Sequence, residues 1–442
     1  MAKYSTRSLM RASLGLEDFE DQEVVVADPS ETIVGLDPEE NVAETILDVN
    51  DGVGEIEDNE DVLNVLGEAA TTLEAIAITI EETLQNADVS AKDEEGLSDD
   101  AVAMAAVAIG EVDDKIGIDT DDISDPMATA KFYEPSVESF QGGKRRQASL
   151  ETLADVKNRL QAVWNAIKKA IVAFGQMVVN FFVGLVSKSA MLARKAKQIE
   201  AASKDMKEGK EEFVFKGAAK LAIGVKFNGA SDVLEGLKKF MAYGNENIPK
   251  YVDGVTKVFG LLDHKGTTSD SAEMSRTIDA AAAHLAVEGL PGGWRVEHEG
   301  KGEGLSGALK SQPQLVAGKN GPDTAAKYAP ATAAQVAEIA RGVQMLALKG
   351  VATRKAESDR LKKMADDFVA KSAAAIKDEK FMEAAKDRVS LTINMRLGGK
   401  PWAKPVVQYA QIAFGICGAA LNFCELSIRA SQGKKEPDAA KA

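Results

Sequence analysis

Histidine and cysteine are the residues that most often hold metals or act as nucleophiles, and this chain of 442 residues has only three and two of them. His264, His284 and His298 belong to no HExxH motif and have no cysteine at the spacing of a zinc site. Cys417 and Cys424 lie in one apolar helical pattern, where about 10 Å of helix rise separates them. That distance excludes a disulfide between them. We predict two buried free thiols and no metal site.

Two further patterns resemble ligand-binding loops but lack essential positions. Four aspartates within residues 119–125 suggest a calcium loop, yet the glycine at its sixth position and the glutamate at its twelfth are missing. Gly302, Gly304 and Gly307 satisfy GxGxxG, but no buried strand precedes them. The chain also has no P-loop and no GxSxG motif. We predict no enzyme and no cofactor, while an enzyme whose carboxylates converge only in the fold stays open as an alternative.

Charge is distributed very unevenly along the chain. Residues 1–143 carry 37 acidic and 6 basic residues, a net charge of −31, whereas residues 144–442 carry 32 and 47, a net charge of +15. The change of sign falls in the stretch from Gln141 to Glu151. Such asymmetry indicates two parts with separate roles, of which the basic part suits a polyanion or an anionic surface.

The basic charge is densest directly after this junction. Residues 144–210 hold 14 basic and 5 acidic side chains. A solvated helix face is one interpretation, and non-specific contact with double-stranded DNA is the other, because phosphate contacts release counterions and need no base recognition. The candidate DNA contacts are Lys144, Arg145, Arg146, Lys157, Arg159, Lys168, Lys169, Lys188, Arg194, Lys195 and Lys197.

The acidic part, residues 1–143, is predicted to be a partly disordered segment with short amphipathic helices. High acid density, prolines and glycines indicate little regular structure between Glu17 and about Asn59. Apolar residues at spacings of three and four then predict a helix over residues 61–86, and Ser98 reads as the cap of a second helix up to about Gly110.

The strongest helical pattern follows the junction, where residues 171–186 are almost all apolar. A buried core helix, a helix lying on or inserting into a membrane, and a true transmembrane span are the three interpretations, although 16 residues are short for a bilayer. A last apolar helix is predicted from Pro405 to about Arg429. Pairing these two helices would bury both.

The remaining body is predicted to be helical, with one small insertion. We expect helices over residues 231–240, 248–262, 271–285, 331–376 with a bend at Gly342 or Gly350, and 379–397. A strand over residues 294–298, a Gly-rich loop and a return strand near residues 314–317 form the exception.

The predicted fold is therefore mainly α: an acidic prosegment followed by an elongated helical bundle with a small β-hairpin insertion. Its parts are the prosegment 1–143, a basic helical region 144–290, the strand and loop insertion 291–330, C-terminal helices 331–432 and a loose tail 433–442.

This arrangement resembles the internal head proteins of large tailed bacteriophages, also called inner virion or prohead core proteins. The shared features are the acidic segment up to Gly143, the Ser-Leu-Glu tripeptide at 149–151 opening a basic helix, the Pro-Gly-Gly turn at 291–293 and the closing helix ending at Arg429. The likeness in layout covers most of residues 140–432.

The resemblance implies that the phage maturation protease removes the acidic prosegment by cutting after the glutamate of a short tripeptide. Glu138 and Glu151 are the cleavage candidates, since a cut there separates the two charges; Glu17 and Glu68 also fit the tripeptide. After a cut at Glu151, residues 152–442 keep 44 basic and 31 acidic residues, a net charge of +13.

We therefore expect a structural, non-enzymatic protein of the head interior, assembled in the cytoplasm of the host bacterium. Its expected partners are the maturation protease, capsid shell or core proteins, and packaged double-stranded DNA. The alternative is a membrane-active helical protein, ejected or pore-forming, that its acidic segment keeps soluble.

Overall fold

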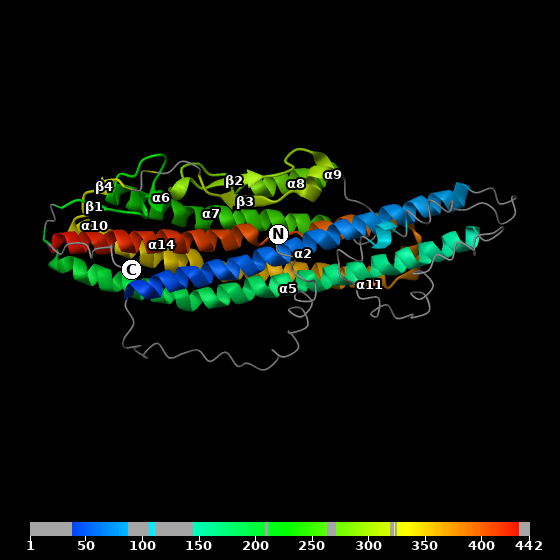
Figure 1. Ribbon diagram of the computed structural model, residues 1–442, viewed down its shortest axis with the longest axis horizontal. Helices are drawn as coiled ribbons and strands as arrows, with labels where there is room; N and C mark the ends of the chain where they lie inside the picture. The colour runs from blue at the N-terminus through cyan, green and yellow to red at the C-terminus, as the bar shows by residue number, and fades with distance from the viewer. Residues whose placement is uncertain are drawn as a thin grey trace, which may run out of the picture.

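The computed structural model describes residues 38–86, 105, 107–110, 145–207, 211–262, 271–318, 322 and 325–432. Long helices dominate these ranges and run along the longest axis of the molecule (Figure 1). The mainly α prediction, with a small antiparallel strand pair, is confirmed. The α-helices are α2 (Pro38–Asn86), α5 (Arg145–Ala202), α6 (Ala218–Leu221), α7 (Ala230–Leu261), α8 (Ser271–Ala283), α9 (Gly304–Lys310), α10 (Ala333–Met345), α11 (Lys355–Ile376), α12 (Glu379–Glu383), α13 (Ala385–Gly398) and α14 (Lys404–Ser431).

Helix α2 is continuous from Pro38, so the prediction of little regular structure before Asp61 is wrong for residues 38–60. Glycines and a high acid density weaken the local preference for a helix there, and tertiary packing overrides it. At Gly52, for example, the ring of Phe181 on α5 packs directly against α2, and a Cβ at this position would lie 3.1 Å from that ring. Of the second predicted helix, the described residues Ala105 and 107–110 are helical.

Helix α7 runs straight through Gly244, where two separate helices were predicted. Tyr409 of α14 packs on this glycine so closely that a Cβ would collide with the tyrosine oxygen. Gly244 is therefore a contact point between helices and not a break. The predicted interruption near Gly350 is confirmed: a π-helical turn, η6 (Leu346–Val351), and a 3-10 turn over residues 352–354 separate α10 from α11.

The predicted hairpin is confirmed as strands β2 (Arg295–His298) and β3 (Pro313–Val316), which pair antiparallel with His298 opposite Pro313. The short helix α9 lies between them, where a loop was predicted. A second pair, β1 (Phe213–Val214) with β4 (Lys327–Tyr328), was not predicted, because two residues per strand are too few for an alternating pattern.

Helix α14 lies in the middle of the bundle and contacts α2, α5, α7 and α10. Cys417 and Cys424 are buried and free, as predicted, and burial raises the pKa of the Cys417 thiol to about 12. By length and composition alone, α14 is apolar enough to cross a membrane, and so are residues 45–85 of α2 and 149–205 of α5.

The apolar stretch of α5 is only partly buried by this arrangement. The most apolar part of α14 is 61% buried, whereas that of α5 is 28% buried. Val172, Val183 and Val186 are 39%, 44% and 46% exposed. The expected pairing therefore buries α14 but leaves one face of α5 in solvent.

The first test asks whether α2 belongs to the hydrophobic core. Leu73 of α2 is fully buried, so Leu73→Ala should lower the free energy of unfolding by about 2 to 5 kcal/mol. Leu47, 61% exposed on the same helix, provides the control, and Leu47→Ala should change it by about 0.5 kcal/mol or less. Urea unfolding followed by circular dichroism measures both. Equal small effects would show that α2 is only loosely attached.

Candidate functional site

The contact between the acidic helix α2 and the basic helix α5 is the candidate functional site. The two helices lie side by side and antiparallel (Figure 1). Lys188 Nζ lies 3.2 Å from Asp48 Oδ2 at one end of the contact, and Lys157 Nζ lies 2.8 Å from Glu81 Oε1 at the other. Between them, Asn59 donates to the sulfur of Met177. The two helices therefore stay in contact over about 50 Å of their length.

The centre of this contact is apolar. Buried residues of α2 recur at spacings of three and four, as in a coiled coil, which gives the helix one continuous apolar stripe. Helix α2 packs against α5, α13 and α14, and we call the surface that these three helices present to α2 the body groove. The buried apolar residues of α2 are Val49, Val53, Ile56, Leu63, Leu66, Ala69, Ala70, Leu73, Ala77 and Ile80.

Carboxylates also occupy this stripe, and each of them meets a cation of the body. Helix α2 contains 14 acidic residues and no basic residue. Glu60, 6% exposed, accepts a hydrogen bond of 2.8 Å from Lys404 at the start of α14. Glu74 and Glu81 face Arg388 of α13. Charge complementarity therefore adds to the apolar packing along the whole groove.

Arg388 is the most deeply buried charge of this site, with no solvent exposure. Its guanidinium donates to Glu81 Oε2 at 2.7 Å and to the backbone oxygen of Met382 at 2.9 Å. Its Nε lies 3.4 Å from Glu74 Oε1 without hydrogen-bond geometry, and neither oxygen of Glu74 accepts a hydrogen bond within the described residues. Loss of the partner of such a buried charge costs about 3 to 5 kcal/mol.

The two carboxylates beside Arg388 titrate differently. Burial raises the pKa of Glu74 to about 7, and the attraction of Arg388 offsets this only in part. Burial acts in the same direction on Glu81, but hydrogen bonds from Arg388 and Lys157 outweigh it and lower the pKa of that carboxyl. Near neutral pH the site thus holds one firmly charged and one partly protonated carboxylate.

The cleavage candidates lie in different settings. Glu138 lies outside the described residues. Glu151 is exposed, but it stands in the second turn of α5, next to Thr152 and Leu153, which are 2% and 8% exposed. A cut after Glu151 would therefore require the start of α5 to unwind and Leu153 to leave the core.

The candidate DNA contacts divide into three groups. Lys144 lies outside the described residues; Arg145 and Arg146 begin α5, and the structure does not describe their side chains. Lys157, Lys188 and Lys195 pair with Glu81, Asp48 and Glu425, and Arg159 is 4% exposed beside Asp155. Lys168 is half-buried, which lowers its pKa, and Lys169, Arg194 and Lys197 are exposed.

Sequence reasoning missed the cations that hold α2, Arg388 and Lys404. They lie far from α2 in the sequence and meet it only in the fold. A signal existed on the other partner: Glu60 and Glu74 interrupt the apolar stripe of α2 at core positions, where an unpaired carboxylate would be costly.

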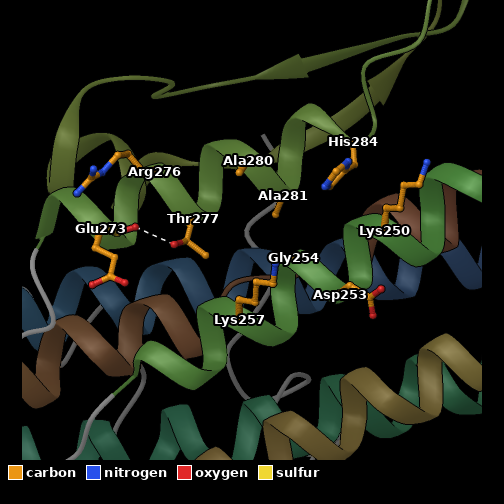
Figure 2. A pocket seen from close by; sticks show the side chains of 10 residues that line it. All are labelled: Lys250, Asp253, Gly254, Lys257, Glu273, Arg276, Thr277, Ala280, Ala281 and His284. Atoms are coloured by element: carbon orange, nitrogen blue, oxygen red, sulfur yellow. Dashed lines mark hydrogen bonds between the residues drawn. The ribbon is translucent and has the colours of Figure 1, made fainter.

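A cavity of about 570 Å³ between α7 and α8 is a second place where a ligand could fit (Figure 2). Arg276 and Lys250 lie at its opposite ends, and Asp253 pairs with Arg360 of α11. The dashed bond in Figure 2 runs from Thr277 to the backbone oxygen of Glu273. Its charges have mixed signs and do not converge on one point, so we assign no ligand to it.

Asp279, His298 and Ser311 are arranged like a Ser-His-Asp catalytic triad, but their contacts only hold neighbouring segments together. His298 Nε2 contacts Ser311 Oγ, whereas Asp279 Oδ1 lies 3.9 Å from His298 Nδ1, too far for a hydrogen bond. Ser311 is 2% exposed, so a substrate cannot reach its hydroxyl. Within the described ranges, no cluster of His, Cys, Asp or Glu has the geometry of a metal site.

The described residues define an elongated helical bundle protein whose acidic and basic helices pair. A family model of phiKZ-like phage internal head proteins matches residues 53–424, most of the chain. The chain belongs to this family, which places it inside the virion head. No curated protein and no solved structure matches it. Because the match begins at Val53, most of α2 lies within the part that the family model covers.

The pKa of Glu74 predicts a pH dependence of stability. Since folding raises this pKa from 4.5 to about 7, the folded protein binds an extra proton between these values. This group therefore stabilises the fold at acidic pH, and about 3 kcal/mol of that contribution is lost as the pH rises to 7. Glu74→Gln should remove this part of the slope in urea unfolding between pH 5 and pH 7.5. The exposed Glu55→Gln should leave it unchanged, and equal slopes in both variants would contradict the assignment.

Proposed function

We propose that this internal head protein is made as a precursor in which the acidic half covers the basic body until the phage maturation protease cuts the chain. It is a structural protein without enzymatic activity, assembled in the host cytoplasm together with capsid shell or core proteins. One observation carries the proposal: the carboxylates of α2 are the partners of Lys157, Lys188, Arg388 and Lys404.

The geometry of α5 favours Glu138 over Glu151 as the site of the cut. A protease needs an accessible, extended segment, and Glu151 lies within a helix whose neighbouring side chains are buried. Glu138 precedes the first residue of α5, Arg145, so a cut there leaves the helix whole. Residues 139–442 carry 47 basic and 32 acidic side chains, a net charge of +15.

The body then contacts packaged double-stranded DNA without sequence preference. Lys169, Arg194 and Lys197 are exposed. At about 100° per residue, they point in directions within about 90° of one another around the axis of α5, so they lie along one face of the helix. Loss of the acidic half frees Lys157, Lys188 and Lys404 as well. These cations neutralise phosphates and release counterions, which is sufficient for binding without base contacts.

The exposed valines of α5 favour membrane activity as the second candidate function. Val172, Val183 and Val186 lie on the same side of α5 as the exposed cations, so this face is apolar in the middle and basic at both ends. Such a face suits an anionic lipid surface. It ranks second because the valines form a narrow stripe on a helix that the bundle otherwise holds.

Analysis of the protein from native particles tests the cleavage site. We expect a chain that starts at Ser139, identified by its intact mass and N-terminal residue. In phage carrying Glu138→Ala this product should disappear, whereas Glu151→Ala should leave it unchanged. A start at Thr152 would show that the protease unwinds α5, and a start at Met1 or Ala2 would refute the precursor model.

DNA binding can be measured on the full chain with a site-specific protease sequence inserted after Glu138. The cut protein should bind labelled duplex DNA of any sequence and lose about a thousandfold in affinity between 50 and 200 mM salt, while the uncut protein binds far more weakly. The triple variant Lys169→Gln, Arg194→Gln, Lys197→Gln should lower the slope of log affinity against log salt by about 3.

The control for this experiment changes three lysines of other helices, Lys238, Lys239 and Lys355, to glutamine. Their side chains are 69%, 41% and 40% exposed, and the change in net charge is the same. It should leave the slope nearly unchanged. Leakage of anionic liposomes by the cut protein, without any binding to DNA, would support the membrane function in place of the first.

A further inference from the structure

The contacts of α2 hold it on the body without help from the chain that joins them. Helix α2 ends at Asn86 and α5 begins at Arg145, so the bond after Glu138 lies in the connection between the two helices. The interface itself extends from Asp48 with Lys188 to Glu81 with Lys157. A cut at Glu138 removes the tether and leaves every one of these contacts in place.

The packing of α2 is that of a core helix. Leu73, Ala70 and Ala77 have no solvent exposure, and Val49 and Ile80 have 1%. On the body, Leu160, Val163 and Trp164 of α5 belong to the same core and have no exposure either. Departure of α2 would expose both sides of this apolar interface to water, which strongly opposes release.

Arg388 adds an electrostatic reason for retention. Its carboxylate partners within the described residues, Glu74 and Glu81, both belong to α2. When α2 leaves, the guanidinium keeps backbone oxygens as partners but has no counter-charge. A buried charge without its partner is unfavourable, so release requires an ion that takes the place of the carboxylates.

We infer that the acidic fragment stays docked after the cut, with α2 in the body groove, and leaves only when a polyanion competes for its cations. The inference rests on the proposed function for the cut at Glu138. Cleavage converts an intramolecular contact into a bimolecular one and thereby makes α2 displaceable. While the fragment is docked, the complex of fragment and body keeps the formal net charge of −16 of the whole chain. The protease therefore only cuts the chain, and packaged DNA then releases the fragment.

The experiment uses the full chain with the site-specific protease sequence after Glu138. After the cut, size-exclusion chromatography at about 150 mM salt should return both pieces in one peak at the volume of the uncut chain. Addition of duplex DNA should move the body into a DNA-bound peak and leave the acidic fragment in a separate one. Intact mass identifies the pieces in each peak.

A pair of variants relates retention to the packing of α2. In the cut protein, Leu73→Ala should raise the dissociation constant of the acidic fragment at least about tenfold, while the exposed Leu47→Ala should not change it. Similar dissociation constants for the two variants would overturn the role of the groove.

The outcomes separate this inference from the proposed function. If the pieces part without DNA and the body then binds DNA, retention is refuted while the proposed function stands. If the pieces stay together and DNA neither binds nor displaces the fragment, the proposed function fails, and so does displacement by a polyanion. Co-elution followed by release on addition of DNA supports both.

Discussion

The guanidinium of Arg388 is fully buried, and the arrangement of the surrounding helices depends on giving it carboxylates. Helix α13 carries the arginine, α2 supplies Glu74 and Glu81, and α5 joins the network through Lys157. Apolar stripes with a repeat of three and four permit several registers between two long helices. A slide of α2 by one turn would take its carboxylates away from Arg388, so the charges select one register.

Small residues determine how closely the other helices approach α14. The ring of Tyr409 lies against Gly244 of α7 and Gly350 of η6, where side chains would collide with it. Burial raises the pKa of the Tyr409 hydroxyl, which has no hydrogen-bond partner within the described residues. The π-helical turn at residues 346–351 thus coincides with a close contact between η6 and α14.

Helix α5 has two faces with different environments. One face packs in the core against α2, α10, α11 and α14, while the other keeps three valines and several cations in solvent. For a protein of the head interior, the covered face explains how α2 neutralises part of the basic charge. The open face offers a surface for a partner whether or not α2 is present.

The sequence was sufficient to establish the charge asymmetry and the resemblance to internal head proteins. It also predicted the helical composition, a hairpin within residues 294–317 and the buried free thiols. These properties come from composition and short-range spacing, which a single chain displays directly. Helix α2 upstream of Asp61 could not be predicted, because Gly52 and dense acids oppose a helix until Phe181 and the body groove stabilise it.

The fold was needed to show that the acidic half contributes a core helix and that Arg388 and Lys404 hold it. It also showed that half of the candidate DNA contacts with described side chains, Lys157, Arg159, Lys188 and Lys195, already have acidic partners. The physical reason is sequence distance: Glu74 and Arg388 are more than 300 residues apart, and no local pattern records which distant charge will neutralise a buried carboxylate.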